Sequence, residues 1–304
     1  MVTQVLELTN VSKRFGSKDI VKDVNLSVFS SEIFGFLGPN GAGKTTTIRM
    51  IVGLIKPSSG EISICGFSLK DDYKRAMSNV GCIIESPDMY KYLTGMENLQ
   101  QFAAMDKRIT RKRIDEVVEM VGLTNRINDK VSTYSLGMRQ RLGIAQAIMG
   151  RPKLLILDEP TNGLDPAGIA EFRHLIRRLA YEEGMAVFIS SHILSELQLV
   201  CDTVAIVSKG RVVKSVKVSE IAGDEIVEWH LNNPSRALQI LMERWNINGE
   251  QTRKSTVRAG TGTVRVEDIN QVFFSEGLKI SYCESHGNSL EELFLNLTEG
   301  DEIV

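Results

Sequence analysis

The chain has 304 residues, of which 42% are hydrophobic and 24% charged, a composition typical of a globular protein with about two domains. The formal net charge of −2 and the pI near 6.2 give no global preference for nucleic acid or for an anionic membrane. Apolar runs such as residues 154–157 are far shorter than the roughly 20 residues of a membrane-spanning helix, and residues 1–10 lack the pattern of a secretion signal. We therefore expect a cytosolic chain whose membrane role, if any, depends on a partner.

Cysteine and histidine usage points to neither disulfides nor a metal site. The four histidines are dispersed, and the four cysteines lie beside apolar or small residues without C-x-x-C spacing. Reduced cysteines packed as small hydrophobic side chains are the expectation.

Up to about residue 220, near-continuous apolar runs alternate with helical patterns and glycine-rich turns. Such runs are typical of strands buried on both faces, so they predict a layered α/β core in a domain spanning residues 1–222. These strands are expected at residues 33–37, 154–157, 187–190 and 204–207.

The pattern changes after about residue 225, where residues 226–231 alternate in polarity as in a half-exposed strand. A helix is expected at residues 237–245, strands at 263–266 and 278–282, and a terminal helix after the capping box at 289–292. Residues 223–304 are therefore predicted to form a small α+β accessory or regulatory domain.

A phosphate-binding loop is the strongest single signal. The segment "GPNGAGKT" follows an expected strand, precedes a helical stretch and fits the pattern G-x-x-x-x-G-K-[ST]. Its glycines let backbone N–H groups turn toward phosphate oxygens, Lys44 would reach the β- and γ-phosphates, and the Thr45 hydroxyl would join a Mg²⁺ shell. The candidate nucleotide-binding residues here are Gly38, Pro39, Asn40, Gly41, Ala42, Gly43, Lys44, Thr45 and Thr46.

Two acids follow another buried strand, in the segment "LLILDEP". Asp158 suits a contact to Mg²⁺, and Glu159 suits orienting or deprotonating an attacking water. Because open α/β sheets bind ligands at the carboxyl ends of their strands, both acids are expected near the phosphate loop.

The order of four further segments carries a family resemblance. "YSLGMRQ" (134–140), "DEP" (158–160), "GLDP" (163–166) and the histidine of "FISSH" (188–192) together resemble the ATPase subunit of an ABC transporter over residues 3–220. The resemblance implies a P-loop NTPase fold with a β-subdomain, a helical subdomain at about 88–150, and ATP and Mg²⁺ as ligands.

The resemblance also implies roles for particular residues. Ser135 and Gly137 would contact the γ-phosphate held by a second subunit, in a head-to-tail homodimer or heterodimer. Asp165 would link the two sites, His192 would act beside the catalytic base, and Phe15 would stack on adenine.

Departures from the usual family pattern narrow the subgroup. Leu136 and Met138 replace glycine and glutamine in the signature segment, and Glu85 replaces the glutamine that senses Mg²⁺ and touches the membrane subunit. The signature form resembles subfamilies paired with ABC-2-type exporters, and Glu85 resembles the exporter ATPases of bacitracin resistance and lantibiotic immunity. Residues 87–92, which mix aromatic, Met and charged side chains, would help to receive the membrane subunit; a plain surface loop is the alternative.

The expected function is therefore ATP hydrolysis coupled to export by separate membrane permease subunits, at the inner face of the cell membrane. The alternative is a soluble ABC-type ATPase acting on ribosomes or DNA, but the chain has one phosphate loop and no long heptad insertion. The basic run at 106–115 reads as a solvated helix face rather than a nucleic-acid site. A GTPase is disfavoured because no N-K-x-D sequence is present.

Overall fold

The computed structural model describes residues 3–85, 87–221, 225–262 and 264–287. Its contacts divide the chain into a first unit up to Ser215 and a second unit from Val216, and each unit has a hydrophobic core of its own. The boundary predicted at residues 222–223 falls outside the described ranges and stays a prediction.

The first unit is built on a six-stranded sheet with the order β10-β9-β3-β8-β7-β6, in which the strands from β9 to β6 run parallel to one another. Its strands are β3 (Ile33–Leu37), β6 (Val80–Ile83), β7 (Leu154–Asp158), β8 (Ala186–Ser191), β9 (Thr203–Ser208) and β10 (Arg211–Lys217). Because β3, β7 and β8 are buried along their whole lengths, apolar residues occupy both faces. The four predicted strands and the α/β class are confirmed, with strand ends within one residue of the prediction.

An antiparallel sheet with the order β2-β1-β4-β5 packs against this centre. Its strands are β1 (Gln4–Phe15), β2 (Lys18–Phe29), β4 (Ser59–Ile64) and β5 (Phe67–Ser68). One core cluster joins Leu6 of β1, Ile48 of helix α1 (Lys44–Ile51) and Phe188 of β8, all of them fully buried.

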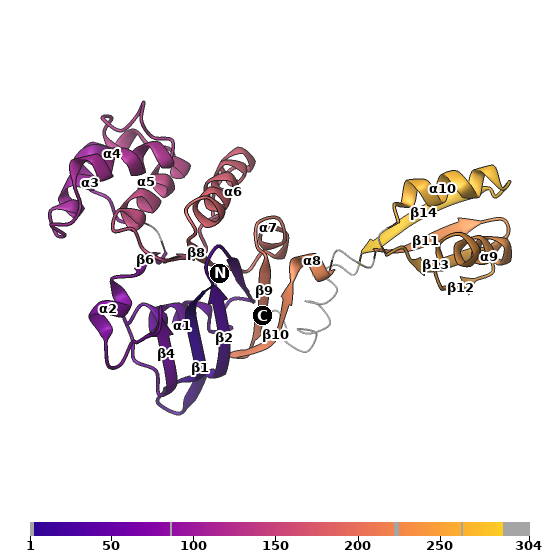
Figure 1. Ribbon diagram of the computed structural model, residues 1–304, viewed down its shortest axis with the longest axis horizontal. Helices are drawn as coiled ribbons and strands as arrows, with labels where there is room; N and C mark the ends of the chain where they lie inside the picture. Colours follow the sequence, from indigo (N-terminus) through magenta and orange to yellow (C-terminus); the bar gives the residue numbers. More distant parts are fainter. Residues whose placement is uncertain (1–2, 86, 222–224, 263, 288–304) are drawn as a thin grey trace. The chain divides into compact units, whose positions relative to one another are not determined.

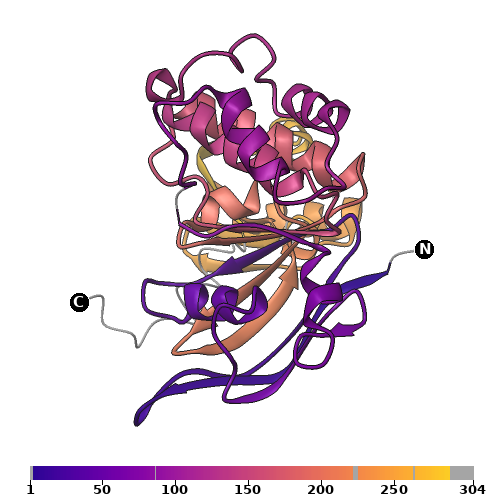
Figure 2. The same ribbon diagram turned by 90° about the vertical axis from the view of Figure 1, so that its left-hand side faces the viewer.

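A group of helices is inserted between β6 and β7. It consists of α3 (Gly95–Ala103), α4 (Arg111–Met120), the 3₁₀ turn Val131–Thr133 and α5 (Leu136–Ile148). Thr94 and Glu97 form a capping box that starts α3. Figures 1 and 2 show this magenta group on the opposite side of the six-stranded sheet from the indigo β1–β2 hairpin.

The remaining helices of the first unit are α2 (Tyr73–Met77), α6 (Pro166–Tyr181) and α7 (Leu194–Gln198). No helix in the described ranges is long and apolar enough to cross a membrane.

After the short helix α8 (Val218–Ile221), the second unit has the element order β-α-β-β-α-β with an antiparallel sheet ordered β12-β13-β11-β14. This is the split β-α-β arrangement of ferredoxin-like domains. Its elements are β11 (Glu225–Leu231), α9 (Pro234–Trp245), β12 (Gly249–Arg253), β13 (Thr256–Gly260), α10 (Val266–Ser275) and β14 (Ile280–Gly287). Trp229, fully buried at its centre, donates its indole N–H to Asn270 (2.7 Å).

The prediction of a strand at residues 263–266 is wrong. Helix α10 begins at Val266 because its branched residues supply the face that packs on the sheet, with Ile269 buried and Val266 half-buried against the same core. The strand predicted at 278–282 begins two residues later, at Ile280. The helix predicted after residue 289 lies outside the described residues.

Candidate functional site

The phosphate loop (residues 38–45) joins β3 to α1, as predicted. Gly43 has a φ of 99°, and a Cβ added there would lie 2.9 Å from the Ile20 carbonyl oxygen, so only glycine fits. Thr45 and Thr46 lie in the first turn of α1. The N–H groups of a first helical turn have no acceptor inside the helix, and this turn is therefore suited to bind an anion.

Lys44 is the buried cation of this loop, with 6% of its surface exposed. Its ammonium lies 2.6 Å from the carbonyl oxygen of Gly38, 3.3 Å from that of Pro39 and 3.3 Å from the Glu159 carboxylate. All three ammonium hydrogens thus have nearby acceptors within the site. The oxygens of a phosphate bound here would replace some of these protein oxygens as hydrogen-bond acceptors for the Lys44 ammonium.

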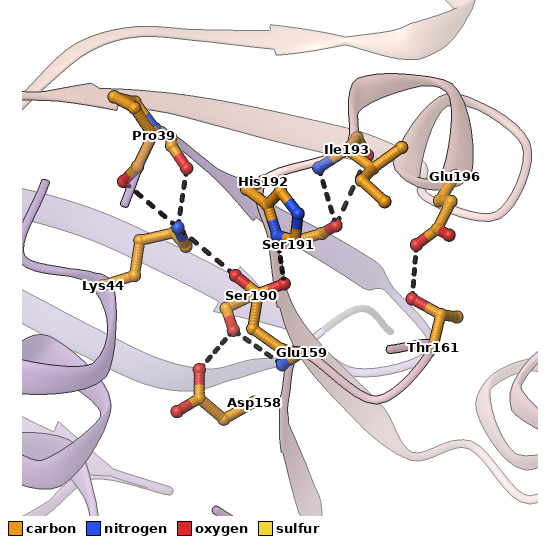
Figure 3. A network of polar contacts seen from close by, with 11 residues as sticks. Pro39, Lys44, Asp158, Glu159, Thr161, Ser190, Ser191, His192, Ile193 and Glu196 are labelled. Atoms are coloured by element: carbon orange, nitrogen blue, oxygen red, sulfur yellow. Dashed lines mark hydrogen bonds and ion pairs between the residues drawn. The ribbon is translucent and has the colours of Figure 1, made fainter. Parts of the chain in front are cut away.

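Glu159 stands between Lys44 and His192 at the carboxyl ends of β7 and β8 (Figure 3). One carboxylate oxygen faces the Lys44 ammonium, and the other lies 2.7 Å from His192 Nδ1. The Glu159 N–H donates to the Ser190 hydroxyl at 3.0 Å, which fixes a backbone with φ of 48°. A left-handed backbone at a non-glycine residue is uncommon, and such residues concentrate at functional sites.

The donor set also fits Mg²⁺ in part. Asp158 is 3% exposed, and among the described residues its carboxylate contacts one hydroxyl, that of Ser190. A buried carboxylate without an ion-pair partner is well suited to a cation, and Thr45 offers a second oxygen on the first turn of α1.

Glu85 lies apart from the proposed Mg²⁺ ligands. It lies two residues after β6 with a φ of 66°, its side chain is 68% exposed, and its carboxylate forms an ion pair with Arg49 on α1 at 2.8 Å. No contact among the described residues joins Glu85 to Thr45 or Asp158. As a Mg²⁺ ligand, Glu85 would have to exchange Arg49 for the metal, and that role stays a prediction.

The signature residues and Asp165 occupy helix starts in the structure. Ser135 caps α5 by accepting the Met138 N–H at 3.2 Å, and Asp165 caps α6 by accepting the Gly168 N–H at 2.8 Å. No contact among the described residues joins Ser135 or Gly137 to the phosphate loop of the same chain.

Phe15 lies at the end of β1 with half of its surface exposed, and the Lys13 ammonium lies over its ring, 4.9 Å from the centroid. Its ring is therefore accessible for stacking, and its contact with adenine stays a prediction.

Four residues with contacts at or near the site were not singled out in the sequence: Arg49, Thr161, Ser190 and Glu196. Ser190 precedes His192 in "SSH", and its place at a strand end was the available signal. The other three depend on tertiary pairings that local patterns do not encode.

Comparison with known proteins places the chain in a family. An uncharacterized ABC transporter ATP-binding protein of Bacillus subtilis, YhcH, is 47% identical over 296 residues, which cover 97% of this chain and 96% of that protein. The chain belongs to the ABC transporter ATP-binding family. The family model for ABC transporters matches residues 21–162 of this ABC chain, from β2 through the phosphate loop to the segment just after Glu159.

Two relatives of this ABC chain have named transport roles. The bacitracin transport ATP-binding protein BcrA of Bacillus licheniformis is 38% identical over 305 residues, covering 99% of this chain and 100% of that protein. The lantibiotic transport ATP-binding protein SrtF of Streptococcus pyogenes is also 38% identical, over 240 residues that cover 79% of this chain and 99% of SrtF. The resemblance to the bacitracin and lantibiotic branch is thus confirmed.

A solved structure confirms the fold class. A dimeric ATP-binding cassette bound to ADP and inorganic phosphate, in a post-hydrolysis state, aligns with a TM-score of 0.62 at 26% identity and covers 70% of this ABC chain and 98% of its own.

Proposed function

We propose that this ABC chain hydrolyses ATP to drive export of a peptide antibiotic of the bacitracin or lantibiotic kind through separate membrane permease subunits. The observation that carries the proposal is the Glu159 carboxylate held between Lys44 and His192. The full-length similarity to BcrA supports the substrate class. On this proposal the chain works in the cytoplasm, bound to the inner face of the membrane through its permease.

The chemistry assigns one task to each side chain. Lys44 binds the β- and γ-phosphates, and Glu159 orients the attacking water and accepts its proton. His192 holds the second carboxylate oxygen of Glu159 and so fixes the direction of the first. Mg²⁺, when bound, supplies neutralising charge for the phosphates, and Thr45 and Asp158 would hold it.

The position of the signature residues supports an assembly of two ATPase subunits. Ser135 and Gly137 lie at the start of α5, and no contact among the described residues joins them to their own phosphate loop, so they can serve the site of a second ATPase subunit. A serine hydroxyl and the N–H groups of a helix start form a suitable anion site. We infer a head-to-tail dimer with ATP between the subunits, and the solved relative with ADP and phosphate is itself dimeric.

The segment at residues 87–92 offers a surface for the permease. Tyr90 and Tyr92 are 50% and 70% exposed, and their rings contact each other with centroids 5.8 Å apart. Exposed aromatic side chains are enriched at protein interfaces, so this pair supports docking of a permease helix.

Purification from native membranes tests the partner. The tagged chain, extracted in mild detergent, is expected to copurify in near-equal amount with a protein of several membrane spans. Copurification with ribosomes or DNA instead would favour the soluble ATPase alternative.

Lys44→Ala tests the nucleotide site. Removing the ammonium leaves the phosphates without their main cation, so we expect loss of tight ATP binding and of the antibiotic resistance that the transporter confers. Isothermal titration with ATP measures the first effect, and growth in bacitracin measures the second. Unchanged ATP affinity contradicts the proposed site.

A further inference from the structure

Two loops surround the proposed base. One runs from Pro160 to Asp165 and ends at the cap of α6, and the other carries His192 into α7. They are joined at the base by the His192–Glu159 contact and farther along by a contact of Thr161 with Glu196 of α7 (Figure 3). The second contact has no part in the proposed chemistry.

The Thr161 hydroxyl donates to the Glu196 carboxylate in a largely apolar environment. Thr161 is 8% exposed, and both residues line a small cavity whose walls include Ile169, Phe172 and Leu197. A hydrogen bond to a charged acceptor is stronger where water is excluded.

Arg173 of α6 lines the same cavity. Its Nε is buried and has no hydrogen-bond partner among the described residues. The Glu196 carboxylate therefore shares its cavity with the Arg173 guanidinium.

Thr161 also lies where it can fix the backbone of the base. The Asn162 N–H donates to the Glu159 carbonyl at 3.3 Å, and the Leu164 N–H donates to the Thr161 carbonyl at 3.1 Å. Anchoring the Thr161 side chain thus restrains the turn that begins at Glu159, whose own backbone is strained.

We propose that Glu196 is a positioning residue for ATP hydrolysis, which acts by holding Thr161 and, through it, the turn that aims the Glu159 carboxylate. This inference rests on the proposed function of Glu159 as the base. It predicts that loss of the contact lowers the rate of the chemical step and leaves ATP binding unchanged.

Single variants measure the effect on turnover. Glu196→Ala and Thr161→Val are each expected to lower kcat on the order of ten-fold, with the KM for ATP changed by less than about two-fold. Thr161→Ser, which keeps the hydroxyl, should retain wild-type kcat. Gln198→Ala, an exposed position on the same helix, is the matched control and should change neither constant.

The double variant Thr161→Val/Glu196→Ala separates positioning from folding. Because it leaves neither partner buried and unpaired, its Tm should recover relative to Thr161→Val. Its kcat should nevertheless stay as low as in the single variants. A kcat that recovers together with Tm, or single variants that lower Tm without lowering kcat, would overturn the proposal.

Hydrogen exchange supplies a readout that needs no ATPase activity. In nucleotide-free protein, Glu196→Ala should speed amide exchange at residues 162–164 on the order of ten-fold, whereas Gln198→Ala should not. Unchanged exchange in both variants overturns the proposal. Absence of Lys44-dependent ATPase activity in the wild-type chain would instead reject the proposed function.

Discussion

At the scale of single residues, the site depends on backbone conformations that sequence motifs do not specify. The order of Lys44, Glu159 and His192 predicted that these side chains belong together, and the structure brings all three into contact. The φ of 48° at Glu159 and its bonds to Ser190 arise from the pairing of β7 with β8. Such geometry depends on tertiary contacts. The motif alone could therefore predict which residues form the site, but not the backbone conformation of Glu159 or the direction of its carboxylate.

Glu85 shows the same limit more clearly. The family resemblance suggested a ligand for Mg²⁺ at this position, whereas in the structure the Glu85 carboxylate pairs with Arg49. That pairing joins the segment after β6 to α1 across 36 positions of sequence, a separation that local patterns do not cover.

Glu85→Gln tests whether the acid matters for coupling. An exposed ion pair contributes at most about 1 kcal/mol, so Tm and ATP affinity should stay near wild-type values. The loss of charge should change the amount of antibiotic exported per ATP hydrolysed, measured in vesicles containing the permease. Arg49→Lys, which keeps the charge of the partner, is the control. Equal export per ATP in Glu85→Gln and wild type would reduce Glu85 to a subgroup marker.

At the scale of elements, strands buried on both faces were predictable, and the fully exposed strand β12 (Gly249–Arg253) was not. Residues 33–37 and 154–157 are continuous apolar runs, which are typical of strands in a parallel sheet with both faces covered. Strand β12 was missed because all five of its residues are exposed, so that it has no alternation of polar and apolar residues.

Helix α4 corrects the interpretation of the basic run at 106–115. Arg111 and Lys112 are exposed as expected, but Arg113 is 8% exposed and donates to the carbonyl oxygens of Ile148 (2.8 Å) and Met149 (3.2 Å). The last carbonyls of a helix have no partner within it, and Arg113 supplies one for the end of α5.

Arg113→Leu is therefore expected to destabilise the packing of α4 on α5 by about 2–3 kcal/mol, because buried carbonyls lose a charged donor. Native-state hydrogen exchange of the α5 amides measures this loss. Lys112→Leu, at the exposed neighbouring position, is the matched control and should have little effect. Similar exchange in the two variants would contradict the capping role.

At the scale of the whole molecule, the two units have separate hydrophobic cores. The second core centres on Trp229, which contacts the Phe273 ring edge-on with centroids 5.6 Å apart. The sequence predicted an α+β domain here from strands at 226–231, 263–266 and 278–282, a helix at 237–245 and a helix after residue 289. Its ferredoxin-like order could not be predicted, since the exposed strand β12, the largely buried strand β13 and helix α10 were not recognised.

Trp229→Ala tests whether the units fold independently. Truncating a buried tryptophan costs about 3–5 kcal/mol, enough to unfold a small unit. We expect fast hydrogen exchange throughout β11 to β14 with wild-type ATP affinity in the first unit. Trp245→Ala, at a half-buried position of the same unit, should have a smaller effect. Loss of ATP binding in Trp229→Ala would mean that the second unit supports the first.

The central claim is that Glu159 is the base of an ATPase, and Glu159→Gln tests it most directly. Glutamine retains the shape of the side chain and loses the proton-accepting charge, so ATP affinity should be preserved while turnover falls on the order of 10²- to 10⁴-fold. ATP binding and phosphate release are measured on the same preparation. Retained binding with lost turnover is the predicted result, and turnover within a few-fold of wild type would contradict the account.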